Sequence, residues 1–161
     1  MAIQVGEKIP SVQLMHLTDK GPAPISTDEL FAGKTVVLFA LPGAFTPTCS
    51  NNHLPGYIQH FEALSDKGVD TIACLSVNDA FVMGAWGKAQ NADGKVLMLA
   101  DGNCELTEKL GLVMDGSAFG MGKRSLRYAM IVRDGVVESL NIESNPGAAV
   151  ESGAEAVLAQ L

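Results

Sequence analysis

Three short apolar runs, separated by stretches with helical spacing, constrain the fold of this chain more than any other feature. The first run, Val36–Leu41, is continuously apolar, as in a strand that is covered on both faces of a sheet. Val69–Val77 and Val96–Ala100 show the same pattern, with helical patterns between the runs. Strands that alternate with helices predict an α/β fold.

The helical stretches can be placed by their caps and apolar faces. A helix with one buried face is expected after the first run, and Pro55 should kink it because proline lacks a backbone N–H. Asn78-Asp79 suits the start of a second helix. A third, over Glu105–Leu110, should end at Gly111. The expected buried faces are Leu54, Tyr57, Ile58, Phe61 and Leu64 in the first helix, and Val82, Trp86 and Ala89 in the second.

The C-terminal third predicts a hairpin and a last helix. Asp134-Gly135 is a turn signal between the strand-like stretches Tyr128–Val132 and Val136–Leu140. The Ala-rich tail, 147–161, is expected to be helical, and residues 9–27 should hold short strands or loops. Together these elements predict an α/β sandwich with a mixed sheet.

Size and charge narrow the possible functions. A chain of 161 residues is expected to form a single domain, residues 1–161. Its net charge of −7 argues against nucleic acid or an anionic membrane as the partner, since both need a concentrated basic face. No apolar run is long enough to cross a membrane. No signal peptide is visible, which favours a cytoplasmic protein, although an organelle reached after removal of a targeting segment stays open.

The three cysteines do not form a familiar framework. Cys49, Cys74 and Cys104 are odd in number and widely spaced, unlike a secreted disulfide scaffold. They form neither a C-x-x-C pair nor a Cys/His cluster with zinc spacing, so no metal site is expected. A reducing compartment is the simplest inference.

Cys49 is the main candidate for a functional residue. Thr46 is a favourable N-cap residue and Pro47 fits the first helical position, which places Cys49 in the first turn of a helix. Free backbone N–H groups and the positive end of the helix dipole stabilise a thiolate there. The alternative is an inert cysteine that packs as a small apolar side chain.

The surroundings of Cys49 resemble the active-site region of peroxiredoxins of the type II/type 5 branch, and the resemblance extends over nearly the whole chain. The matching stretches are PGAFTPTCS at 42–50, HLPGY at 53–57, CLSVNDAFVM at 74–83, WG at 86–87, LAD at 99–101 and RSLRYAM at 124–130. The resemblance implies a thioredoxin-like fold, with a central mixed sheet flanked by helices and an N-terminal extension. It also implies a thiol peroxidase that reduces hydrogen peroxide and alkyl hydroperoxides without a cofactor.

The resemblance also implies roles for four residues. Cys49 would attack the peroxide as a thiolate and become a sulfenic acid. Arg127 would hold both thiolate and peroxide with its cationic fork. The Thr46 hydroxyl would position the peroxide oxygens, and Pro42 would shield the sulfur from water.

Two further residues near this motif have open roles. Arg124 either assists Arg127 or pairs with a surface carboxylate. His53 lies four residues after Cys49 and raises the alternative of a Cys-His hydrolase. Because a preformed thiolate needs no general base, a structural or dimer-facing histidine is favoured.

The sequence says least about how the sulfenic acid is reduced back to the thiol. Some peroxiredoxins carry a resolving cysteine near the C-terminus, but residues 148–152 contain none. Cys74 is a possible resolving cysteine, yet its strand position would require local unfolding. Cys104 matches no position of the family and is expected to be packed. We therefore expect one-cysteine behaviour, with glutathione/glutaredoxin or thioredoxin as reductant, and a homodimer.

Other functions are compatible with a reactive cysteine. A redox sensor or chaperone on the same scaffold would use the same sulfenic acid and differ only in lacking turnover. A thioredoxin-like disulfide reductase is disfavoured by the absence of C-x-x-C. Thiol peroxidase is the preferred interpretation.

Overall fold

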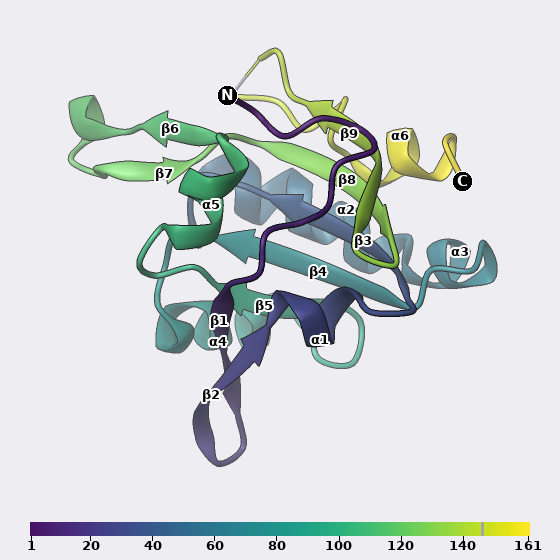
Figure 1. Ribbon diagram of the computed structural model, residues 1–161. Coiled ribbons are helices and arrows are strands. Elements are labelled where there is room, and N and C mark those ends of the chain that lie inside the picture. The colour runs from purple at the N-terminus through teal and green to yellow at the C-terminus, as the bar shows by residue number, and fades with distance from the viewer. Residues whose placement is uncertain (146) are drawn as a thin grey trace.

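The computed structural model describes residues 1–145 and 147–161. Its centre is a seven-stranded mixed sheet in the order β2-β1-β5-β4-β3-β8-β9 (Figure 1). The three predicted apolar runs form the parallel strands β3, β4 and β5, and the other strands join antiparallel. The strands are β1 (Gln13–Thr18), β2 (Gly21–Ser26), β3 (Thr35–Ala40), β4 (Thr71–Ser76), β5 (Leu97–Ala100), β8 (Tyr128–Arg133) and β9 (Val136–Ile142).

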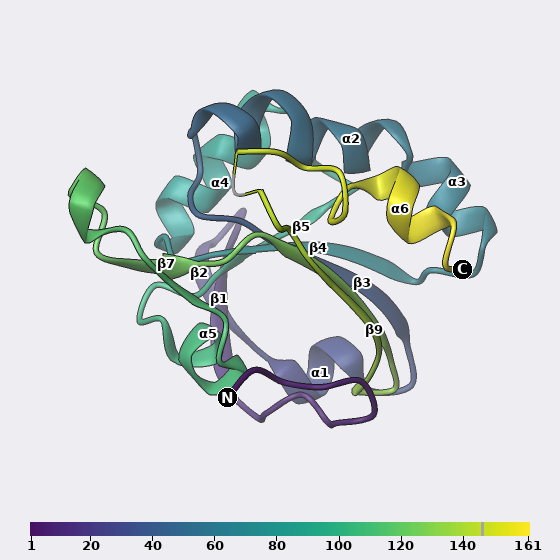
Figure 2. The same cartoon turned by 90° about the horizontal axis from the view of Figure 1, so that it is seen from above.

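Helices cover both faces of this sheet, as Figure 2 shows from above. One face carries α1 (Thr27–Phe31) and α5 (Glu105–Leu110). The other face carries α2 (Leu54–Gln59), α3 (Phe61–Asp66), α4 (Ala80–Ala89) and α6 (Ala154–Leu158). A small two-stranded sheet of β6 (Val113–Asp115) and β7 (Lys123–Ser125), joined through the 3₁₀ turn η2 (Ser117–Phe119), extends from one side (Figure 1).

Alternation along the central strands divides the core in two. In β3, Val37 and Phe39 face the helices α2, α3, α4 and α6, whereas Val36 and Leu38 face α1 and α5. This is the period of two expected for a strand buried on both faces. Cys49 and Cys74 belong to the first of these two cores.

Several local predictions are confirmed by the caps. The Asp79 carboxylate accepts a hydrogen bond from the backbone N–H of Val82 and caps α4. Gly111 ends α5 in the left-handed conformation with φ 71°. Asp134 and Gly135, with φ 48° and 79°, form the tight turn of the β8–β9 hairpin. Residues 9–27 contain the β1–β2 hairpin and the start of α1.

Two predictions about helices were wrong. Ala89 is exposed, and the buried face of α4 consists of Ala80, Met83, Trp86 and Gly87. The tail is not helical from residue 147; α6 spans Ala154–Leu158 only. Residues 150–152 instead lie against the Glu143 carboxylate, whose hydrogen bonds replace those of a helix.

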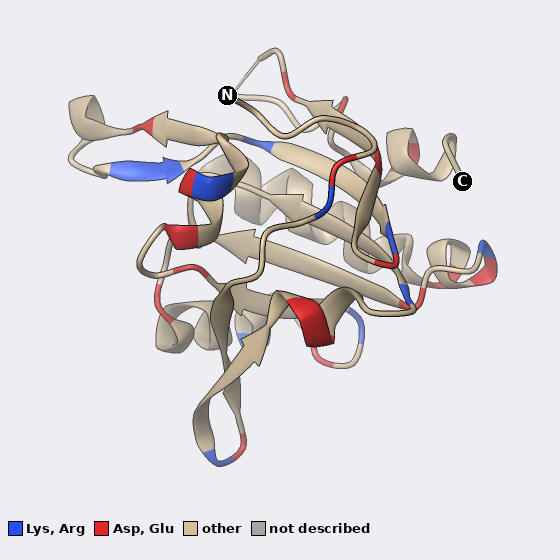
Figure 3. Cartoon of the chain, viewed as in Figure 1, with Lys and Arg blue, Asp and Glu red and all other residues tan. Residues whose placement is uncertain are grey.

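Charged residues lie mainly at helix ends and loops, with acidic and basic side chains interspersed (Figure 3). β7 and the segment after it carry Lys123, Arg124 and Arg127. In the part of the chain that the structure describes, no helix has both the length and the apolar composition needed to span a membrane.

Candidate active site

Cys49 lies at the end of the loop that leaves β3. The Asn78 side chain accepts a hydrogen bond from the backbone N–H of Ala44 at 3.0 Å and so ties this loop to the end of β4. The Thr46 hydroxyl donates to the Gly43 carbonyl at 2.7 Å, which closes the turn before the helix. The helical conformation begins at Pro47, as the sequence predicts, and Cys49 lies in its first turn.

The turn that contains Cys49 is π-helical, which the sequence analysis did not predict. The backbone N–H of Leu54 bonds to the carbonyl of Cys49, five residues back, in the turn η1 (Cys49–His53). Pro55 gives a physical reason for the wide turn, because it cannot donate to the carbonyl of Asn51 and would clash with it in a regular α-helix. A single proline predicts a disturbance in the helix, but not its type.

Sheet topology brings Arg127 to Cys49. β8 is antiparallel to β3, with Tyr128 opposite Ala40, so the residue before β8 lies beside the loop after β3. Arg127 Nη2 donates to Cys49 Sγ at 3.2 Å. The arginine is only 5% exposed and Cys49 has no exposed surface. The sulfur therefore lies in a dry environment beside a fixed cation, where an anion is stabilised.

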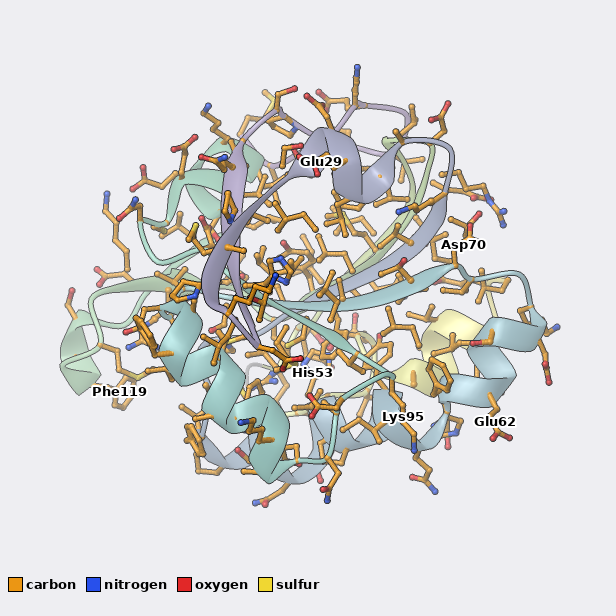
Figure 4. All side chains as sticks on the ribbon, turned by 90° about the horizontal axis from the view of Figure 1, so that it is seen from below. Glu29, His53, Glu62, Asp70, Lys95 and Phe119 are labelled. Atoms are coloured by element: carbon orange, nitrogen blue, oxygen red, sulfur yellow. The ribbon has the colours of Figure 1, made fainter. Side chains whose placement is uncertain are left out.

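His53 joins the same cluster from η1. Arg127 Nη1 lies 2.9 Å from His53 Nδ1, and His53 Nε2 lies 3.0 Å from the carbonyl of Ser152. These partners assign the proton to Nε2, because a carbonyl needs a donor and a guanidinium needs an acceptor. Burial first, and then Arg127, lower the pKa of His53 from 6.5 to about 3, so the ring is neutral. Figure 4 shows His53 in the interior, whereas Phe119 lies on the periphery.

Arg124 holds the backbone of the cysteine loop. Its Nη1 donates to the carbonyl of Pro42 at 3.2 Å, and its Nε donates to the carbonyl of Met121 at 3.1 Å. It therefore connects the β6–β7 extension with the start of the loop. Pro42 itself is half-buried.

The other two cysteines, Cys74 and Cys104, are also buried. Cys74 is fully buried in β4, facing the same core as Cys49. Burial and, after it, the nearby Cys49 raise the pKa of the Cys74 thiol well above its ordinary value. Cys104 precedes α5 with φ 60°, is also buried, and has its pKa raised by burial and by Asp101. Among the described residues, no group of three or more His, Cys, Asp or Glu side chains is placed to hold a metal ion.

The sequence analysis did not predict the residues that bind the Nε2 side of the His53 ring. The carbonyl of Ser152 accepts from both His53 Nε2 and the Tyr57 hydroxyl, the latter at 2.6 Å. The Glu143 carboxylate in turn binds the backbone of residues 150–152. No local motif connects these residues, which are brought together by the packing of the C-terminal loop on η1 and α2.

Comparison with known proteins shows the family to which this chain is similar. The sequence profile of the Redoxin family matches residues 4–158. Peroxiredoxin-2E-2, chloroplastic, of Oryza sativa subsp. japonica is 51% identical over 99% of this chain and 72% of its own length. A peroxiredoxin of Synechocystis sp. is 51% identical over 88% of this chain and 79% of its own length. A crystal structure of reduced Prx3 from Vibrio vulnificus in complex with hydrogen peroxide superposes with a TM-score of 0.93, at 56% identity and 98% coverage of both chains.

Proposed function

The chain belongs to the Redoxin family and is a peroxiredoxin, a thiol peroxidase with a thioredoxin-like fold; from this premise we propose that Cys49 is its peroxidatic cysteine. The observation that carries the assignment is the 3.2 Å contact between Arg127 Nη2 and Cys49 Sγ. All three cysteines are buried, but desolvation raises the pKa values of Cys74 and Cys104 and so disfavours their thiolates, whereas Cys49 accepts a hydrogen bond from a guanidinium. Cys74 and Cys104 are therefore poor candidates for the nucleophile, which must react as a thiolate.

The proposed reaction is a two-electron displacement at oxygen. The Cys49 thiolate attacks one peroxide oxygen and forms an S–O bond as the O–O bond breaks. The departing oxygen leaves with the electron pair and takes up a proton to become water or an alcohol. Cys49 is oxidised to a sulfenic acid and the peroxide is reduced.

Ionisation of the sulfur supplies only part of the rate. An ordinary thiol with a pKa of ~8.5 is about 3% ionised at pH 7, so full ionisation gains roughly 30-fold. Enzymatic accelerations are commonly ~10⁶-fold or more. The rest must come from orienting the peroxide and stabilising charge on the leaving oxygen.

Three residues are proposed to supply that orientation. Arg127 donates to the sulfur through Nη2, and its planar cationic fork is the kind of group that can hold a thiolate and a peroxide oxygen together. The Thr46 hydroxyl donates its proton to Gly43, so its oxygen is available as an acceptor for the peroxide O–H. Pro42 presents no N–H that would compete for the peroxide.

Arg124 is proposed to act indirectly, by holding the carbonyl of Pro42 and with it the start of the cysteine loop.

The peroxide must also be able to reach the Cys49 sulfur, which is covered in this conformation. A small displacement of the loop 42–46 or of η1 must precede reaction. A small hydroperoxide, such as hydrogen peroxide or a short alkyl hydroperoxide, is the proposed substrate.

An external thiol is proposed to reduce the sulfenic acid. Cys74 lies inside a central strand, between β3 and β5, and cannot leave it without breaking the sheet. Glutathione with glutaredoxin, or thioredoxin, is therefore the proposed reductant. A reducing compartment such as the cytoplasm is the proposed location, and a homodimer is the proposed assembly.

Peroxide consumption with each reductant, for the wild type and for each Cys→Ser variant, tests this proposal. Cys49→Ser should lose all turnover. Cys74→Ser and Cys104→Ser should keep turnover with the preferred reductant. Loss of turnover in Cys74→Ser would refute the one-cysteine route, and single-equivalent oxidation without turnover would favour a redox sensor.

A further inference from the structure

Glu143 carries an unusual concentration of hydrogen bonds for a residue outside the cysteine motif. It follows β9 directly and is 9% exposed. Its Oε2 accepts from the backbone N–H groups of Val150, at 3.1 Å, and of Ser152, at 2.9 Å, and from the Ser152 hydroxyl at 2.7 Å. Its Oε1 accepts from the N–H of Glu151 at 3.1 Å. One carboxylate thus fixes three successive residues.

The peptide fixed in this way continues into the active site. Ser152 donates to Glu143 through its N–H and hydroxyl, and offers its carbonyl to His53 Nε2 and to the Tyr57 hydroxyl. The carbonyl is therefore held on the far side of the imidazole from Arg127. Its position decides which ring nitrogen carries the proton.

The tautomer matters because Arg127 is a donor and never an acceptor. With the proton on Nε2, Nδ1 presents its lone pair to Arg127 Nη1, and Nη2 is left pointing at Cys49 Sγ. With the proton on Nδ1, two donors would face each other and the guanidinium would have to turn. Misplacement of a positioning group by about 1 Å can slow an enzyme by about 100-fold.

We propose that Glu143 is a positioning residue for Arg127, acting through the Ser152 carbonyl and the Nε2–H tautomer of His53. This inference rests on the proposed function, because its consequence is a rate of peroxide reduction at Cys49. The backbone adds a second link, since the N–H of Glu143 donates to the carbonyl of Arg127 at 2.9 Å.

Glu151 offers a matched control. It is the neighbouring carboxylate on the same loop, is exposed, and binds the backbone N–H and hydroxyl of Ser144. Glu151→Gln removes the same charge and also disturbs a loop contact. It leaves the Glu143–Ser152–His53 connection in place.

The experiment combines kinetics with ¹⁵N NMR of the imidazoles. Stopped-flow measurement gives the rate constant for oxidation of Cys49 by hydrogen peroxide, at a pH where the thiol is fully ionised. The ¹⁵N shifts give the tautomer of His53, whose signals are assigned by their loss in His53→Gln. Wild type should show the proton on Nε2. Glu143→Gln should show a changed tautomer population and a rate about tenfold lower or more, whereas Glu151→Gln should stay within about twofold of wild type.

Several results would overturn the inference. The first is a proton on Nδ1 of His53 in the wild type. The second is a folded Glu143→Gln variant in which either the rate constant or the tautomer population is unchanged from wild type. If Glu143→Gln does not fold, Ser152→Ala, which removes the 2.7 Å hydroxyl contact, must show both changes at smaller size. A wild type that does not react at Cys49 would refute the proposed function instead, while its tautomer would still test the inference.

Discussion

At the scale of single residues, the site is organised around one buried guanidinium. Arg127 lies between the sulfur of Cys49 and the neutral ring of His53, and donates to both. A buried cation is stabilised by an anion beside it, and Arg127 is the cation that contacts the Cys49 sulfur. A neutral His53 adds an acceptor without adding a second positive charge.

Replacing Arg127 by lysine tests orientation separately from charge. An ammonium keeps the positive charge but loses the fork that reaches sulfur and peroxide together. Arg127→Lys should lower the rate of peroxide reduction about 100-fold even at a pH where Cys49 is fully ionised. Stopped-flow kinetics would measure this, with Arg133→Lys, an exposed arginine paired with Glu138, as control. Equal rates for Arg127→Lys and wild type would refute the orienting role.

Burial of neutral His53 predicts an acid-sensitive fold. Its pKa is about 3 in the native protein and near the ordinary 6.5 in the unfolded chain. Between these values the unfolded chain binds the extra proton, so the free energy of unfolding should fall by about 1.4 kcal/mol per pH unit as the pH drops. Burial raises the pKa of Glu143, but the hydrogen bonds from residues 150–152 together outweigh it, so the net pKa is lowered in the native state and Glu143 adds to this loss only at more acidic pH.

Urea unfolding of wild type and His53→Gln between pH 6.5 and pH 5 would measure that slope. The variant should show a shallower dependence than the wild type. His16→Gln, which also removes one imidazole but leaves His53 in place, is the control for the substitution itself. Identical slopes for wild type and His53→Gln would show that His53 is not buried as a neutral ring.

At the scale of elements, sequence patterns predicted strands and caps better than helix geometry. Continuous apolar runs gave β3, β4 and β5, and turn residues gave the β8–β9 hairpin. The π-turn at Cys49 was missed because Pro55 predicts a disturbance in the helix but not its type. The late start of α6 was missed because residues 150–152 bind the Glu143 carboxylate, a contact that a local pattern does not contain.

Two helical glycines give opposite predictions at this scale. A Cβ at Gly56 in α2 would meet no atom within 4 Å, so Gly56→Ala should stabilise the protein by about 0.5–1 kcal/mol. A Cβ at Gly84 in α4 would lie 2.8 Å from the Cβ of Leu17 in β1, so Gly84→Ala should destabilise it by about 1–3 kcal/mol. Urea denaturation would compare them. A Gly84→Ala variant as stable as wild type, or more stable, would contradict the packing of α4 on β1.

At the scale of the whole molecule, the antiparallel pairing of β8 with β3 assembles the site. It brings Arg127 to Cys49 across 78 positions of sequence. The cysteine loop could be identified from its residues, and Arg127 from the resemblance to peroxiredoxins. Glu143 and Ser152 could not, because their link to the site runs mainly through hydrogen bonds between side chains and backbone, which carry no sequence signature.

The proposed homodimer is tested by mass. Phe45 is 57% exposed beside the active site, and burying such an apolar side chain favours association. Light scattering should give twice the monomer mass of 16.9 kDa, and Phe45→Glu should shift the mass towards the monomer. Val136 lies at the turn of the β8–β9 hairpin, away from the end of β8 that adjoins the cysteine loop. Val136→Glu should therefore leave the mass unchanged. A wild-type mass of 16.9 kDa would contradict the proposal.

The central claim is that one sulfur, next to Arg127, reacts with peroxide. The reduced protein can be mixed with one equivalent of hydrogen peroxide in the presence of dimedone, and the modified residue located by mass spectrometry. We predict a single adduct on Cys49 that is absent from Cys49→Ser. An adduct on Cys74 or Cys104 with Cys49 unmodified would contradict the account.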